Sequence, residues 1–161
     1  MPKEHFSTTS AIRVMKEKGI SFTLHQYRYE EHGGTEVSAR ELGVDEHIII
    51  KTLVMEDDRK VPFIILMHGD RHVSTKNMAR YLGAKSVQPC DPNIAERHTG
   101  YRVGGTSPFG TRKHLKIFIE STILDLPRIL INAGQRGLLA EMSPLDMAKA
   151  LSTEAVNVAI D

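Results

Sequence analysis

A glycine-rich loop is the first feature of this chain that could do chemistry. The run GYRVGGTSPFG, from Gly100 to Gly110, has four glycines and a proline in eleven residues, which excludes an ordinary helix or strand. Ser107 is pushed toward an extended conformation because Pro108 follows it. Such a loop can aim several backbone N–H groups into one small space, as anion nests and oxyanion holes do. On glycine content alone, a tight connection between two elements is the other interpretation.

A lysine inside an apolar segment is the second feature. Lys51 lies in residues 48–55, IIIKTLVM, whose β-branched residues predict a strand. A lysine there either guards a sheet edge and reaches water, or holds its ammonium in a cleft, where it attracts an anion or polarises a carbonyl. Since a lysine normally has a pKa near about 10.4, it is a cation and serves more naturally as an electrostatic stabiliser than as a base.

Three other positions are weaker candidates. Tyr27 follows a predicted strand, and its phenol either hydrogen-bonds a substrate or fills the end of that strand. Residues 132–138 form a second glycine turn that carries Arg136, a pattern typical of a hairpin. Cys90 is the only cysteine, and we expect it to be a small buried residue rather than a reactive thiol.

The familiar catalytic motifs are absent from the sequence. It has no G-x-S-x-G elbow, no Walker loop and no H-E-x-x-H. His68 and His72 are four residues apart, but Gly69 and Asp70 between them argue against a continuous helix. We therefore expect no metal and no cofactor.

The elements that must position these residues alternate along the chain. Helices are predicted at 7–18, 35–42 and 75–82, from Asp91 and Pro92 onward, and from Ser143 to about Leu151, with hydroxyl or proline starts and glycine stops. Strands are predicted at 20–25, 48–55, 61–67, 116–120, 128–132 and 156–160, the second and third forming a hairpin. This order predicts an α+β (mixed α/β) fold with a largely antiparallel or mixed sheet.

Composition limits the class of protein. The chain has 161 residues, of which 40% are hydrophobic and 25% charged, and we expect one domain over 1–161. No apolar run is long enough for a membrane span, and the N-terminal MPKEH leads into no signal core. The lone cysteine fits a reducing compartment, so we expect a cytoplasmic protein. With a net charge of +1, a nucleic-acid contact must come from a local patch.

These stretches, in this order, resemble the YbaK/EbsC family of aminoacyl-tRNA deacylases, which is related to the editing domain of some prolyl-tRNA synthetases. The resemblance covers nearly the whole chain, from ISFTLHQY at 20–27 and KTL at 51–53 through YLGAK at 81–85 to TGYRVGGTSPFG at 99–110 and GQRGL at 134–138. It implies a mixed sheet curved around a pocket with helices outside, and cleavage of the ester that joins a wrong amino acid to the tRNA 3′ end.

The resemblance also implies which residues act. It assigns the essential lysine to Lys51 and makes Gly105 the second catalytic position, because Lys51 would anchor the terminal adenosine or the ester while loop N–H groups receive the oxyanion. The implied substrate-binding residues are Tyr27, Thr52, Gly104, Thr106, Ser107, Pro108, Gly110, Gly134 and Arg136. The nucleophile would be water or, for a cysteinyl ester, the thiol of the substrate, which agrees with the absence of a Ser-His-Asp triad.

The amino acid that is removed stays open. Cysteine-selective members carry an acidic residue directly after Arg-Gly-Leu, where this chain has Leu139, so Cys, Ala, Ser and Thr are all candidates. Expected partners are the aminoacyl-tRNA 3′ end and prolyl-tRNA synthetase or another synthetase, with no membrane, and the protein is expected to be a monomer or a weak oligomer. The alternatives are a binding module for a nucleotide, an amino acid or a synthetase, and a metal hydrolase that uses His68 and His72.

Overall fold

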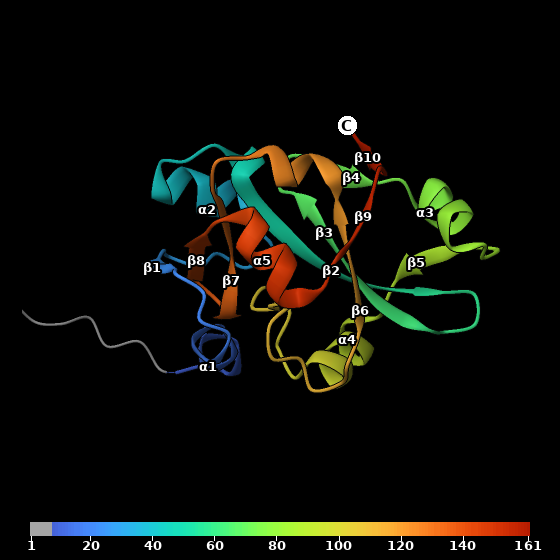
Figure 1. Cartoon of the computed structure of the whole chain (residues 1–161), viewed down its shortest axis with the longest axis horizontal. Coiled ribbons are helices and arrows are strands. Elements are labelled where there is room, and N and C mark those ends of the chain that lie inside the picture. The colour runs from blue at the N-terminus through green and yellow to red at the C-terminus, as the bar shows by residue number, and fades with distance from the viewer. Residues whose placement is uncertain (1–7) are drawn as a thin grey trace, which may run out of the picture.

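A mixed sheet forms the centre of the molecule in the computed structural model, which describes residues 8–161 (Figure 1). The strands are β1 (Thr23–Gln26), β2 (Ile49–Asp57), β3 (Pro62–His68), β4 (His72–Val73), β5 (Val87–Pro89), β6 (Lys116–Glu120), β7 (Ile129–Gln135), β8 (Leu138–Met142), β9 (Glu154–Val156) and β10 (Ala159–Ile160). The helices are α1 (Ser10–Glu17), α2 (Gly34–Leu42), α3 (Thr75–Leu82), α4 (Pro92–Thr99) and α5 (Pro144–Leu151), with short 3-10 turns at Glu46–Ile48 and Ser121–Asp125.

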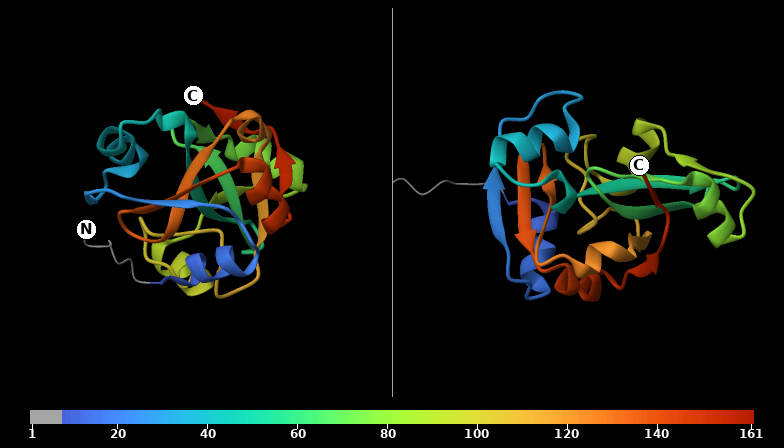
Figure 2. Two further views of the ribbon diagram at one scale, coloured as in Figure 1. Left: turned by 60° about the vertical axis from the view of Figure 1, so that its left-hand side comes forward. Right: turned by 90° about the horizontal axis from the view of Figure 1, so that it is seen from above.

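The sheet follows the order β1-β8-β7-β2-β3-β6-β9, and β5 pairs with β2 away from this path. The β2–β3, β7–β8, β1–β8 and β2–β5 pairs are antiparallel, whereas β2–β7, β3–β6 and β6–β9 are parallel. The sheet curves, and the helices lie around its outside (Figure 2). The predicted mixed α/β architecture is confirmed.

Local signals placed most elements well. The structure confirms the helix at 75–82 and the strand at 116–120 to the residue. Gly43 and Gly83 end α2 and α3 in the left-handed conformation, at φ +66° and +69°, where a side chain would be strained. Pro92 and Pro144 stand at the first turns of α4 and α5, because a proline there loses no helical hydrogen bond.

Some predicted boundaries were wrong. Helix α1 begins at Ser10, because the Thr9 hydroxyl accepts a hydrogen bond from the Ile12 N–H at 3.0 Å, and residue 7 lies outside the described residues. The predicted strand at 20–25 is the shorter β1. The predicted strand at 156–160 is divided between β9, which pairs with β6, and β10, which pairs with β4.

The core has a large cluster on one face of the β2–β3 hairpin and a smaller one on the other. Ile50 belongs to the first, together with Ile64 and Leu66 of β3 and buried residues of α1, β7 and β8. The second contains Met55 and Ile65 and is covered by α3. The alternation of the strand therefore fixes which β2 side chains face which cluster. Among the described residues, every helix is too short or too polar to cross a lipid bilayer.

Strand β2 is paired differently along its two edges. On one edge, β3 faces it without a break from Ile50 to Glu56. On the other edge, β7 pairs with Ile49 and Ile50, and β5 pairs from Met55 onward. No strand of the described chain pairs with residues 51–53 on that second edge, so the sheet has a gap there.

Candidate active site

A cavity of about 570 Å³ opens at this gap. Its walls come from β2, from α2 and the segment before it, from α4, from the glycine loop and from the β7–β8 turn. Six of the predicted site residues line it, and they are Tyr27, Lys51, Thr52, Gly104, Thr106 and Arg136. Segments that are distant in the sequence therefore meet at one place.

Lys51 is half-buried in the cavity wall. Its ammonium donates a hydrogen bond to the Arg71 carbonyl, just after β3. Burial lowers the pKa of the Lys51 ammonium, and the carboxylates of Glu46 and Asp70 act in the opposite direction. An ammonium has three protons, so the bond to Arg71 leaves two for a ligand. Lys51 therefore lies beside an open edge of the sheet, with a side chain that is partly desolvated and faces the cavity.

Thr52 also lines the cavity, but its hydroxyl is buried. Its Oγ1 is out of contact with water and has no hydrogen-bond partner among residues 8–161. Leaving a buried polar group unpaired costs about 1–3 kcal/mol, so such a group needs an explanation. The atom is enclosed by protein, so this cost belongs to the folded protein itself.

The glycine loop is docked onto the β7–β8 turn. The Arg136 side chain donates to the Val103 carbonyl at 2.8 Å, and the Asn132 amide donates to the Gly104 carbonyl at 3.1 Å. A Cβ on Gly105 would lie 2.9 Å from the Arg136 backbone nitrogen, which explains the glycine. The N–H of Gly105 itself donates to the Arg102 carbonyl at 2.8 Å, so this group is engaged within the loop.

The other predicted loop residues lie behind the cavity wall. Ser107 is fully buried, and its hydroxyl accepts a hydrogen bond from the Phe109 N–H at 3.2 Å. Pro108 is buried beside it, and Gly110 packs against α1, where a Cβ would lie 2.8 Å from the Ser10 carbonyl oxygen. A Cβ on Gly134 would lie 2.9 Å from the Tyr101 ring. These four positions shape the loop and do not line the cavity.

Tyrosines and a guanidinium form the rim of the cavity. Burial raises the pKa of Tyr27, so its phenol stays a neutral hydrogen-bonding group. Tyr29 lies against Gly104, and the Arg136 guanidinium stands 5.0 Å from the centre of the Tyr29 ring. The sequence analysis did not propose Tyr29, which lies in no motif, or Asn132, which begins the 132–138 turn.

The other cavity groups carry little reactivity. Cys90 lines the wall, where burial raises the pKa of its thiol to about 11. The thiol is therefore protonated at neutral pH and is a poor nucleophile. This agrees with the expectation of a small buried residue.

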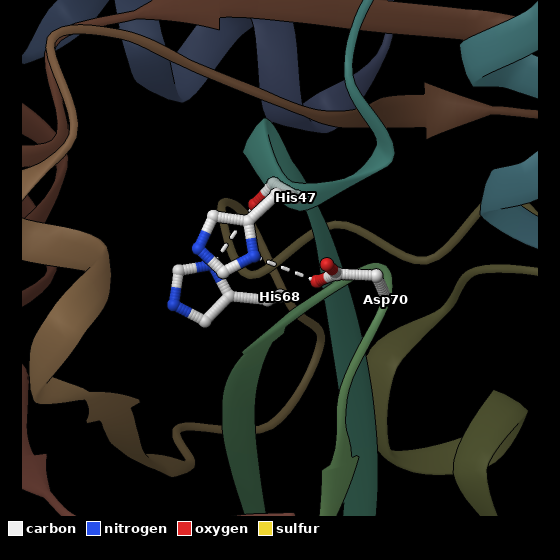
Figure 3. A group of neighbouring side chains, drawn as sticks. All are labelled: His47, His68 and Asp70. Atoms are coloured by element: carbon white, nitrogen blue, oxygen red, sulfur yellow. Dashed lines mark hydrogen bonds and ion pairs between the residues drawn. The ribbon is translucent and has the colours of Figure 1, made fainter. Parts of the chain in front are cut away.

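A histidine pair lies next to the site (Figure 3). The His47 and His68 rings stack at 3.8 Å with an interplanar angle of 6°, and the His47 Nδ1 bonds Asp70 at 2.8 Å. Both nitrogens of His68 are engaged, one with the His47 carbonyl at 2.9 Å and the other with the Thr122 hydroxyl at 2.7 Å. Lone pairs of imidazole lie in the ring plane, so parallel stacked rings do not converge on one metal ion.

The predicted pair of His68 and His72 does not come together as a site. His68 is 1% exposed at the end of β3, whereas His72 is exposed on β4. The geometry gives no support to the metal-hydrolase alternative.

The sequence matches a known family, and the fold is found in solved structures. Residues 30–150 match the model of the family described as Aminoacyl-tRNA editing domain. The chain therefore belongs to this family.

Two curated relatives illustrate the range of the family. The chain is 28% identical, over 84% of its length and 84% of the relative, to "Putative Cys-tRNA(Pro)/Cys-tRNA(Cys) deacylase EbsC" of Enterococcus faecalis. It is 33% identical, over 57% of its length, to proline–tRNA ligase of Nitratidesulfovibrio vulgaris, of which the match covers 16%. The family thus includes a protein of this size and a segment of a much larger synthetase.

Solved structures share the fold. The chain matches one described as "Crystal structure of a putative trans-editing enzyme for prolyl tRNA synthetase", with a TM-score of 0.84 and 18% identity over 97% of this chain and 100% of the other. It matches the hypothetical protein APE2540 with a TM-score of 0.86 and 22% identity over 94% of this chain and 100% of the other. At these identities the likeness establishes the fold.

The unpaired hydroxyl of Thr52 makes a stability prediction. Thr52→Val removes Oγ1 and keeps the shape of the side chain, so we expect the free energy of unfolding to stay unchanged or to rise by up to about 1 kcal/mol. The matched control is Thr99→Val, because the buried Thr99 hydroxyl donates to the Ala95 carbonyl at 2.9 Å. The control should lose about 1–2 kcal/mol in urea unfolding. Equal losses in the two variants would mean that Thr52 has a partner in the free protein.

The buried His68 makes a pH prediction. Burial lowers the pKa of His68 below its ordinary value, so below about pH 6.5 the unfolded chain binds more protons at this position than the native protein. The stability that comes from keeping His68 neutral is fully present above that pH. It is lost as the pH falls toward the native pKa. The difference in unfolding free energy between wild type and His68→Gln should shrink over this range. A difference that stays constant over this range for His68→Gln would contradict the assignment.

Proposed function

We propose that this protein acts in trans as an aminoacyl-tRNA deacylase, within one domain, and cleaves the ester of a mischarged tRNA at its 3′ end. Family membership supports the enzyme class, and a relative that aligns over 84% of this chain is named a Cys-tRNA(Pro)/Cys-tRNA(Cys) deacylase. The observation that carries the proposal is the half-buried Lys51 ammonium, which lines the same cavity as Gly104 and Thr106 of the glycine loop.

The chemistry needs charge stabilisation more than an activated side chain. A water oxygen adds to the ester carbonyl carbon, the carbonyl oxygen becomes negative, and the bond to the ribose oxygen then breaks. The ribose oxygen takes the proton that the water gives up, and the amino acid leaves as its carboxylate with release of one proton to solvent. Lys51 acts as a fixed cation beside the developing charge or the ribose hydroxyl, in a partly desolvated place where such a charge is most effective.

The cavity wall supports a small uncharged amino acid. Leu139 is 4% exposed and packs with Ile49, so the wall is apolar at the position where cysteine-selective relatives carry an acid. Ala, Ser, Thr and Cys esters are the candidate substrates. A pocket of this kind discriminates by about 1–3 kcal/mol per methylene group, which is the range in which synthetases need a second enzyme to correct them.

The biological setting follows from the substrate. The tRNA 3′ end would be the partner common to every reaction, and prolyl-tRNA synthetase is the candidate source of mischarged tRNA, because the editing segment of that enzyme class aligns with this chain. The place of action would be the cytoplasm, where tRNA is charged and used.

Replacement of Lys51 tests the mechanism. We expect Lys51→Met to lower kcat/KM by about 10²-fold or more, because one preorganised charged donor is lost from the transition state. Deacylation of Cys-, Ala-, Ser- and Thr-tRNA(Pro) is measured with wild type, Lys51→Met and the exposed control Lys76→Met. Near-full activity of Lys51→Met would contradict this mechanism. No turnover by wild type on these or other tRNAs, with synthetase added, would favour a binding module.

Replacement of Leu139 tests the source of selectivity. Leu139→Ala enlarges the cavity by roughly three methylene-sized groups, so we expect kcat/KM for Val-tRNA relative to Ala-tRNA to rise about tenfold or more. Ile123→Ala is the matched control, because Ile123 is buried in the core away from the cavity. Selectivity that stays constant in Leu139→Ala would place the amino acid side chain elsewhere.

A further inference from the structure

The gap in the sheet exposes the main chain of one residue to the cavity. The Gly69 N–H donates to the Ile49 carbonyl at 2.7 Å, and the Asp57 N–H donates to the Val61 carbonyl at 3.2 Å, so odd-numbered residues of β2 direct their main-chain groups toward β3. Even-numbered residues direct theirs to the other edge, where the Cys90 N–H donates to the Val54 carbonyl at 3.0 Å. Within the gap, the edge-facing N–H and C=O are therefore those of Thr52.

The neighbouring strands are prevented from closing the gap. The β2–β5 register pairs Met55 with Pro89, and its continuation would bring Pro92 opposite Thr52. A proline has no N–H to give, and this one already begins α4. On the other side, the pairing of β7 shifts register between Asn132 and Gln135, which bends that strand away. Main-chain groups that face this cavity can pair with water or with a ligand, so the opening gives a ligand access to them.

The glycine loop does not offer the Gly105 N–H as an oxyanion donor. The Gly105 N–H, the first candidate for an oxyanion donor, is engaged with the Arg102 carbonyl. The Thr52 N–H lies on the open edge of a strand that β3 holds rigidly along its length. A donor held in this way needs no rearrangement when charge develops, which is what makes such a donor effective.

We propose that the aminoacyl group of the substrate binds this edge as a single-residue strand, paired with the main chain of Thr52. An aminoacyl ester has an ammonium and a carbonyl on either side of one Cα, as a strand residue has an N–H and a C=O. In an antiparallel pair the ammonium donates to the Thr52 carbonyl, and the ester carbonyl accepts from the Thr52 N–H. When water adds to the ester, this N–H faces the oxyanion and Thr52 becomes a catalytic residue. This inference rests on the proposed deacylase function.

The pairing also places the side chain of the amino acid. Residues opposite each other in an antiparallel pair have their side chains on the same face. The substrate side chain would then leave the edge on the same face as the Thr52 side chain, toward Val54 and Cys90 of the cavity wall.

A change in the backbone tests the donor. Replacing Thr52 by its α-hydroxy acid exchanges the N–H for an ester oxygen and keeps the side chain. We expect kcat/KM for the best ester of the panel to fall about 10²-fold. The control places the same change at Leu53, whose N–H faces β3, and should lower the melting temperature more than the change at Thr52. Near-wild-type kcat/KM for the Thr52 ester variant would overturn the proposal.

A change in the substrate tests the acceptor. Propionyl-tRNA lacks the ammonium of alanyl-tRNA and keeps its methyl group. With each rate divided by that of the uncatalysed hydrolysis of the same ester, we expect wild type to prefer the alanyl ester about tenfold or more. Equal normalised rates would overturn the pairing while the deacylase function stands. If wild type cleaved no ester at all, the proposed function would fail and this inference with it.

Discussion

The unbroken pairing of β2 with β3 is the constraint on which the site depends. Each residue from Ile50 to Glu56 has a fixed partner in β3, so the direction of every side chain and every main-chain group of β2 is set. Lys51 leaves one face of the strand, and Thr52 leaves the other. A slip of one residue would exchange the two, bringing the ammonium into the larger core cluster and the hydroxyl to the place of the lysine. Burying an unpaired ammonium in that cluster makes the slip costly.

The glycine loop supports the site by close approach of its backbone. Gly104 lies against the Tyr29 ring, and Gly105 lies against the Arg136 nitrogen, at distances that a Cβ would not allow. The bonds from Arg136 to Val103 and from Asn132 to Gly104 hold loop and turn together. Close packing therefore explains why these positions are glycines. It does not by itself make their N–H groups available to a ligand. For Gly105 that group is already used inside the loop.

Local sequence signals predicted most helices and strands. They did not predict how strands that are distant in the sequence pair with one another. The helix at 75–82 is followed by a glycine stop, and the strand at 116–120 is a run of residues with high strand propensity. The bounds of both were predicted correctly. Strand β5 has three residues and no pattern of its own, because it exists through its pairing with β2. The same holds for the gap opposite Thr52, which results from a register with β5, a proline and a bulge in β7. Lys51 was found from its apolar strand and Thr52 by resemblance, whereas the environment that makes them unusual is a property of the fold.

An open edge explains how two adjacent strand residues can serve one ligand. In a closed sheet, neighbours such as Lys51 and Thr52 point to opposite faces and act in separate compartments. Where the sheet is interrupted, a ligand at the edge touches the main chain directly and reaches both faces around it. Both Lys51 and Thr52 line the cavity, as expected for a cavity that opens at a sheet edge and so meets both faces of the strand. In the proposed mechanism, an ester at this edge has the Lys51 cation on one side and the Thr52 backbone donor beside it, so water can serve as the nucleophile without an activated side chain.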